Sequence, residues 1–334
     1  MSLLSPKDIF KIQSDSEFNQ FAIKVFHYQY QKNLIYNAFV SHIFQRKKQN
    51  ISSIQHYTQI PFLPIEFFKF HTITCFSVTP DTLFFESSGT TQNNLSRHYI
   101  FDESIYKESI LSGFSYFYGN PKDYLFIFLL PDEYQRPHSS LIFMARYLQS
   151  LSNYKESGFY LNDFNTARSL IEKYLKTNTK IFILGLSYAL MDFSENTSKI
   201  ESSSIIIMET GGMKGKREEI PKHLFHQYLK EKLGISHIHS EYGMTELLSQ
   251  AYSKQNGIFY TPPWMKVLVR EIDDPFSIYI SNKHGLINII DLANIHSCSF
   301  IATSDLGKLY DDGSFEIIGR SDFSDIRGCN LMYQ

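Results

Sequence analysis

Three short, continuously apolar runs in the middle of the chain constrain its fold most strongly. They occupy residues 124–130, 181–184 and 205–208. Unbroken apolar runs of this length are typical of strands that are buried on both faces of a sheet. Apolar residues at helical spacing fill the segments between them, namely Leu141, Met144, Ala145 and Leu148, and then Ala167, Leu170, Ile171 and Tyr174. Strands that alternate with helices predict an α/β fold with a largely parallel sheet.

The pattern changes on either side of this region. After residue 262, short apolar segments at 267–269, 277–280 and 286–290 are separated by turn-forming stretches. They predict antiparallel strands that form a second, smaller β lobe. At the other end, residues 1–60 are predicted to be mainly helical, because Phe18, Phe21, Ala22 and Val25 have the i, i+3, i+4, i+7 spacing of one helix face. We expect residues 1–80 to pack on the main body.

Composition excludes several classes of protein. The 32 basic and 34 acidic residues give a formal charge of −2, which does not suggest a nucleic-acid-binding protein. The three cysteines, Cys75, Cys298 and Cys329, form no C-x-x-C pair, so a zinc ribbon or a disulfide framework is not supported. The first twenty residues do not resemble a signal peptide, and the run at 124–130 is too short to span a bilayer. We therefore expect a soluble cytoplasmic protein without membrane insertion.

A loop rich in hydroxyl groups follows a short apolar run at residues 83–85. It contains Ser87, Ser88, Gly89, Thr90 and Thr91. Glycine allows a tight turn and a close approach of the backbone, so that N–H and O–H groups can converge on an anion. The loop is a candidate phosphate-binding segment, although such clusters are more often plain turns. It is not a Walker A loop, because the chain contains no G-x-x-x-x-G-K-[ST].

Two later motifs accompany this loop. Residues 241–246 read Glu-Tyr-Gly-Met-Thr-Glu, and residues 304–322 contain Ser-Asp-Leu-Gly and then Ile-Gly-Arg-Ser-Asp. With these three motifs in this order, residues 81–330 resemble the adenylate-forming (acyl-AMP-forming) ligase superfamily. Within it, the chain is most similar to the acyl-protein synthetase family, the ATP-dependent subunit type of the fatty acid reductase of luminous bacteria. That similarity rests on residues 87–91 with Ser96 and Arg97, on residues 209–215, and on residues 327–329.

The resemblance implies a division of the chain. Residues 81–321 would form the large N-terminal domain of the adenylate-forming fold, with mixed and parallel sheets and a small β lobe. In most of the superfamily a Gly-Arg-x-Asp hinge precedes a C-terminal domain of about a hundred residues. By this resemblance, residues 322–334 would form a short tail in place of that domain, which elsewhere carries a catalytic lysine.

The resemblance also implies a nucleotide site that uses ATP and Mg²⁺. The hydroxyl-rich loop would hold the β- and γ-phosphates, and Arg97 would supply the charge of the lysine that has no clear equivalent nearby. Thr245 would contact the α-phosphate, and Glu246 would hold Mg²⁺, which prefers hard oxygen ligands. The remaining nucleotide contacts would come from Gly211 and Gly212 at the adenine edge, Tyr242 stacked on adenine with Gly243 beside it, Asp305 at the ribose hydroxyls, and Arg320.

Two further candidates have competing interpretations. His138 falls where the superfamily often has an active-site histidine or aromatic residue, although a histidine that caps the helix at Leu141 is the simpler interpretation. Cys329 matches the cysteine near the C-terminus to which the family transfers its acyl group. A thiolate beside Arg327 would be a good acceptor, but a cysteine at this position can also be an inert tail residue.

The sequence therefore predicts ATP-dependent activation of a carboxylic acid, a fatty acid by family resemblance. The acyl group would pass from AMP to Cys329 and then to a partner protein such as a reductase. One alternative is a ligase that delivers the acyl group directly to coenzyme A or to an acyl carrier protein. The other is a non-catalytic subunit that only binds nucleotide or acyl groups.

Overall fold

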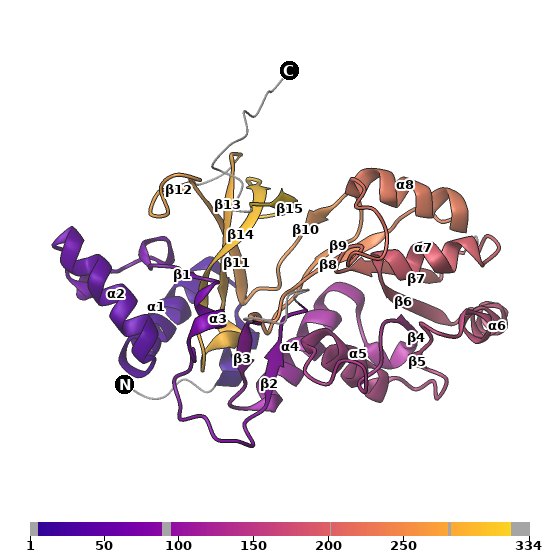
Figure 1. Cartoon of the computed structure of the whole chain (residues 1–334), viewed down its shortest axis with the longest axis horizontal. Coiled ribbons are helices and arrows are strands. Elements are labelled where there is room, and N and C mark those ends of the chain that lie inside the picture. Colours follow the sequence, from indigo (N-terminus) through magenta and orange to yellow (C-terminus); the bar gives the residue numbers. More distant parts are fainter. Residues whose placement is uncertain (1–5, 89–94, 201, 280–281, 322–334) are drawn as a thin grey trace.

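The computed structural model describes residues 6–88, 95–200, 202–279 and 282–321. Two sheets form its framework (Figure 1), and helices cover both of them. The α/β fold predicted from the apolar runs is confirmed: a parallel sheet in the middle of the chain is followed by an antiparallel sheet.

The first sheet has the strand order β5-β4-β6-β7-β8-β9, in which β9 alone is antiparallel to its neighbour. Its strands are β4 (Tyr124–Leu129), β5 (Gly158–Phe159), β6 (Lys180–Leu186), β7 (Ile205–Thr210), β8 (His239–Tyr242) and β9 (Ala251–Ser253). All six residues of β4 are buried, because helices cover both faces of the sheet. In Figure 1, α7 and α8 lie on one side of the sheet and α4 and α5 on the other.

The helices of this region are α4 (Glu103–Tyr118), α5 (Ser140–Leu151), α6 (Phe164–Leu175), α7 (Ser187–Glu195) and α8 (Lys222–Leu233). Helix α8 buries the face that contains Phe225 and Leu229, and Leu224 points away from the core with 48% of its surface exposed. Strand β8 begins at His239, because α8 ends at Gly234 in a left-handed conformation and the chain needs several residues to return to the sheet.

The second sheet has the strand order β10-β15-β14-β13-β11-β12. Its strands are β10 (Ile258–Phe259), β11 (Met265–Arg270), β12 (Ile278–Tyr279), β13 (His284–Asp291), β14 (Phe300–Leu309) and β15 (Phe315–Arg320). A short N-terminal strand, β1 (Leu63–Pro64), pairs with β14 in the parallel direction. The hairpin between β14 and β15 turns at Gly313, whose φ of 79° is accessible to glycine at little cost.

The N-terminal helices pack on this second sheet and its connections. Helix α1 (Asp15–Lys32) begins at a capping box made by Ser14 and Glu17, and α2 (Leu34–Lys47) follows after Asn33. The side chain of Gln29 donates hydrogen bonds to the backbone oxygens of Asn294 and Ile295 at 2.9 and 3.0 Å. These buried contacts join the first helix to a segment more than 260 residues later in the sequence.

The remaining elements are short: η1 (Pro6–Lys11), η2 (Ile51–Ser53), η3 (Tyr57–Gln59), α3 (Phe67–Phe70), η4 (Pro121–Asp123), η5 (Leu292–Asn294), and the hairpin strands β2 (Phe84–Glu86) and β3 (Arg97–Tyr99). Within the described ranges, no helix combines the length and the apolar character that a membrane crossing requires.

Candidate functional site

The hydroxyl-rich loop leaves the β2–β3 hairpin at a fixed position. The backbone N–H of Ser87 donates to the Ser96 oxygen at 3.1 Å, and the Ser96 N–H donates to Ser87 Oγ at 3.1 Å. These two bonds hold both ends of the loop together just beyond the paired strands. Ser87 and Ser88 are therefore positioned, whereas the predicted contacts from Gly89, Thr90 and Thr91 lie outside the described residues.

Lys214, in the segment that follows β7, contacts this loop. Its Nζ donates a hydrogen bond to Ser88 Oγ at 3.1 Å, across 126 residues of sequence. Partial removal of the ammonium from water lowers the pKa of Lys214, and the nearby cations Arg136 and Arg320 lower it further. A lysine that already lies among other cations is a place where a polyanion would be favourable.

No role was predicted for Lys214, because the phosphate-binding lysine was expected close to the hydroxyl-rich loop in sequence. The available signal was the stretch that follows β7. Gly211 and Gly212 have φ values of 71° and 66°, so the chain turns back sharply as it leaves the strand. A Cβ on Gly211 would lie only 2.9 Å from Leu186 Cδ2, so this turn has no room for a side chain. The turn brings Lys214 toward Ser88.

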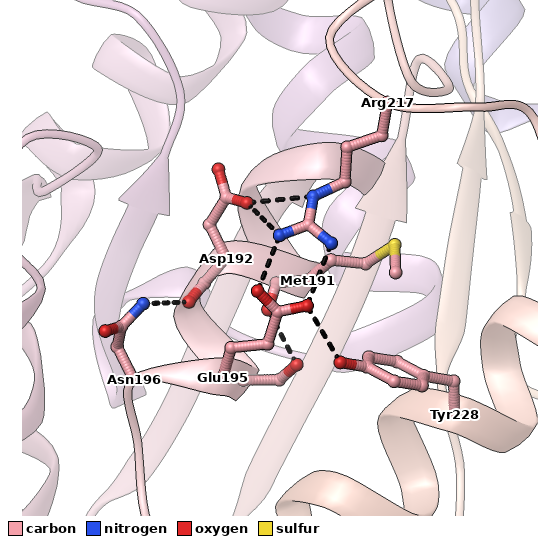
Figure 2. A network of polar contacts seen from close by, with 7 residues as sticks. Met191, Asp192, Glu195, Asn196, Arg217 and Tyr228 are labelled. Atoms are coloured by element: carbon pink, nitrogen blue, oxygen red, sulfur yellow. Dashed lines mark hydrogen bonds and ion pairs between the residues drawn. The ribbon is translucent and has the colours of Figure 1, made fainter.

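An ion-pair network anchors the same segment at Arg217. Figure 2 shows the Arg217 guanidinium between Asp192 and Glu195 of α7, with Tyr228 of α8 bound to the same glutamate. Arg217 donates to Asp192 Oδ1 at 2.5 and 2.9 Å and to the two Glu195 oxygens at 2.6 and 2.8 Å. These bonds lower the pKa of Glu195. The segment between Gly211 and Arg217 is thus attached at both ends.

The motif at residues 241–246 lies at the carboxyl end of β8, beside the turn after β7. Thr210 Oγ1 donates to Glu241 Oε2 at 2.5 Å, and burial raises the pKa of Glu241 to about 7. Gly243 is required next to it, because an added Cβ would collide with Glu241 Oε1. Carboxyl ends of adjacent parallel strands are the usual place for ligands in open α/β sheets.

Tyr242 connects this motif to the antiparallel sheet. Its hydroxyl donates to Asp305 Oδ2 at 2.7 Å, and Arg320 Nε lies 3.8 Å from Asp305 Oδ1. Asp305 and Arg320 are cross-strand partners on β14 and β15. The Tyr242 ring packs edge-on against Phe315. The structure therefore brings together three of the predicted nucleotide-binding residues through one hydrogen bond and one ion pair.

Glu246 lies deeper, near the base of the hydroxyl-rich loop. It is 5% exposed, and burial raises its pKa, while a hydrogen bond with the Ser96 side chain and the charge of Arg320 oppose that effect. The neighbouring Thr245 holds its backbone oxygen 2.9 Å from His98 Nδ1. Among the described residues, no group of three or more metal-ligating side chains occurs. One carboxylate with nearby hydroxyl groups fits Mg²⁺, which keeps several waters and takes further oxygens from phosphates.

Arg97 and His138 lie together at the hairpin, where both side chains are exposed. Arg97 Nε donates to Glu86 Oε1 at 2.7 Å, and the His138 ring stacks on Phe84 at 4.2 Å. The structure thus places Lys214, and not Arg97, against Ser88. The expectation that His138 caps the next helix was wrong: Ser139 caps α5, because its Oγ lies within reach of the helical N–H groups.

The structure describes two of the three cysteines, Cys75 and Cys298. Burial raises the pKa of Cys75 to about 12 and also raises that of Cys298. Neither side chain is therefore a ready thiolate. Cys329, the predicted acyl acceptor, lies outside the described residues.

Comparisons with known proteins give a likeness in fold. No family model matches the sequence, and no curated protein matches it. ATP-bound MatB from Rhodopseudomonas palustris superimposes with a TM-score of 0.54 at 15% sequence identity, over 71% of this chain and 47% of that one. Apo MatB from the same organism gives 0.50 at 13% identity, over 74% and 50%. An ATP-bound RpMatB-BxBclM chimera gives 0.53 at 14%, over 73% and 49%. The chain spans about half the length of these structures.

Proposed function

We propose that this protein is an adenylate-forming enzyme, which uses ATP to activate a carboxylic acid as an acyl adenylate. The observation that carries the proposal is the contact of Lys214 with Ser88, beside the group formed by Tyr242, Asp305 and Arg320. Segments that are far apart in sequence supply these groups where the two sheets meet. They provide cations, hydroxyl groups, and a carboxylate that can accept hydrogen bonds from the two hydroxyls of a ribose. Two solved structures with this fold are described as ATP-bound, which supports ATP as the ligand.

The reaction joins two anions. A carboxylate oxygen attacks the α-phosphorus of ATP, the bond to the bridging oxygen breaks, and pyrophosphate leaves with that electron pair. Lys214 would neutralise charge on the β- and γ-phosphates next to Ser87 and Ser88. Asp305 would accept hydrogen bonds from the ribose hydroxyls, with Arg320 beside it. Positioning and charge neutralisation are the main tasks of a protein in such a displacement.

Mg²⁺ would supply further neutralisation of the phosphate charge. Glu246 would hold it, with Thr245 next to the α-phosphate. The buried carboxyl of Glu246 has a raised pKa, so a bound cation would favour its ionised form.

A more specific hypothesis is that the protein is an acyl-protein synthetase that acts on a fatty acid in the cytoplasm. In the second step, the Cys329 thiolate would attack the acyl carbon and AMP would leave, which gives a thioester for delivery to a partner such as a reductase. One support is the family resemblance of residues 327–329. The other is that the Cys75 thiol has a high pKa and Cys298 is buried, so Cys329 is the remaining candidate nucleophile. A ligase that transfers the acyl group directly to coenzyme A or an acyl carrier protein is the alternative.

The test measures the two steps separately. Pyrophosphate exchange into ATP with a panel of fatty and aromatic acids reports adenylation, which Glu246→Gln should abolish without loss of the fold. Incubation with ATP, Mg²⁺ and radiolabelled tetradecanoic acid, followed by a denaturing gel, should give a hydroxylamine-labile label that Cys329→Ser removes. Full acyl transfer in Cys329→Ser would favour the direct ligase. Tight ATP binding without exchange for any acid would contradict the proposal and favour a non-catalytic subunit.

A further inference from the structure

A cavity of about 520 Å³ lies away from the candidate nucleotide site, between α2 with the segment after it and the antiparallel sheet. A volume in this range suits a small organic ligand. Its apolar lining includes Phe39, Ile43 and Phe44 of α2, together with Phe62, Phe276 and Ile278. None of the residues assigned to the nucleotide site lines it, although Ser304 on its wall precedes Asp305 in β14.

Three charged side chains line the cavity beside these apolar residues, namely the cations Arg270 and Lys47 and the carboxylate Glu66. Arg270, the last residue of β11, is 6% exposed and lines the cavity. Its guanidinium donates to Asn288 Oδ1 at 2.6 Å, to the Thr303 oxygen at 2.7 Å and to the Ile287 oxygen at 3.1 Å. All three acceptors are neutral. Within the described part of the chain, Arg270 makes these hydrogen bonds and no ion pair.

A buried arginine without a carboxylate partner is unfavourable unless something else supplies the charge. Burial lowers the pKa of Arg270 to about 10, and the charge of Glu66, which lines the same cavity without forming an ion pair with Arg270, opposes this. Glu66 also accepts a hydrogen bond from Ser304 at 2.8 Å. At the rim, Lys47, the second cation of the cavity, lies 4.1 Å from the centre of the Phe276 ring, and its charge also acts on Asp274.

We propose that this cavity binds an amphiphile with one carboxylate head and an apolar tail. The carboxylate pairs with Arg270, which can grip it with two N–H groups, and the tail lies along the aromatic and aliphatic side chains of α2 and β12. The site is separate from the nucleotide site, and the inference does not depend on the proposed function.

Fluorescence titration with cis-parinaric acid, without ATP, tests the inference, and the methyl ester of the same acid is the neutral match. The native chain should bind the acid saturably and at least about tenfold more tightly than the ester, because charge-assisted hydrogen bonds are lost with the ester. Arg270→Met should remove that preference and leave ester binding nearly unchanged. Equal affinities for acid and ester in the native chain, or an unchanged preference in folded Arg270→Met, would overturn it.

Arg270→Met can fail to fold because its partners are buried backbone groups, so an exposed rim position provides a second test. Phe276 is 49% exposed, and Phe276→Ala should weaken acid and ester alike by about fivefold. No change for either ligand would overturn the proposal. Lys214→Met and Glu246→Gln serve as controls that leave the cavity intact. If either of these variants weakened the probe while Phe276→Ala did not, the probe would occupy the nucleotide site and the inference would fail.

Discussion

At the residue scale, two buried glutamates on neighbouring strands have opposite protonation behaviour. Burial alone would raise the pKa of Glu209, but Lys222 at 2.8 Å and His226 lower it to about 2. Glu241 is equally buried, and its nearest donor is the neutral Thr210 hydroxyl, so its pKa rises to about 7. One carboxyl is therefore ionised throughout the neutral range, and the other gains or loses its proton within it.

Glu241→Gln should change how stability depends on pH. The pKa of Glu241 in the native state lies above the ordinary glutamate value of 4.5, so the native state holds this proton more tightly, and native stability falls as pH rises from 4.5 to 7. The fully developed effect above pH 7 is on the order of 3 kcal/mol. Glutamine keeps an acceptor for Thr210 without the charge. The melting temperature of the variant, relative to that of the native protein, should therefore increase between pH 5 and pH 8. A difference that stays constant across that range would show that Glu241 does not titrate there.

Lys214 and Arg97 offer a direct comparison between two cations near the loop. Lys214 contacts Ser88, whereas Arg97 is paired with Glu86 on the exposed hairpin. Lys214→Met should weaken ATP binding by about tenfold or more, in line with loss of a charge-assisted phosphate contact. Arg97→Met is the matched control and should have a much smaller effect. Calorimetric titration with ATP measures both, and the reverse order would return the phosphate role to Arg97.

At the element scale, the segment between β7 and α8 shows what sequence patterns could predict. The buried strands and most helices followed from apolar periodicity, because burial of one face is a local property of the sequence. Gly211 and Gly212 were predicted next to the ligand, because they directly follow a parallel strand. The position of Lys214 could not be predicted, since it depends on a turn and on a contact 126 residues away. The Arg217 network could not be predicted for the same reason, because its partners lie on another element.

Arg217→Met should loosen this segment with little effect on the rest of the fold. The network is partly exposed, since the Arg217 side chain retains 30% of its accessible surface, so its share of global stability is small. We expect faster hydrogen exchange at residues 211–217 and weaker ATP binding, with a melting temperature close to that of the native protein. Arg168→Met, which breaks an exposed pair with Glu172 on α6, is the control. Unchanged exchange in Arg217→Met would mean that the glycine turn holds the segment alone.

At the scale of the whole molecule, the two sheets meet at the candidate site. Tyr242 ends β8 of the parallel sheet, and Asp305 belongs to β14 of the antiparallel sheet (Figure 1). The sequence predicted a parallel and an antiparallel region, because their periodicities differ. It could not predict that one hydrogen bond joins them, since Tyr242 was assigned to adenine and Asp305 to ribose separately.

Tyr242→Phe and Asp305→Asn should separate the structural role of this hydrogen bond from the role of Asp305 in ribose binding. Loss of the tyrosine hydroxyl should cost about 1 kcal/mol of stability, as for one hydrogen bond that water replaces in part. If Asp305 also holds the ribose hydroxyls, Tyr242→Phe should leave the preference for ATP over 2′,3′-dideoxy-ATP intact, whereas Asp305→Asn should reduce it. Tyr116→Phe, at a ring that is 62% exposed, controls for the removal of a hydroxyl. Denaturant unfolding and nucleotide titration separate the two roles. An undiminished ribose preference in Asp305→Asn would leave Asp305 as a structural link between the sheets and remove it from the nucleotide site.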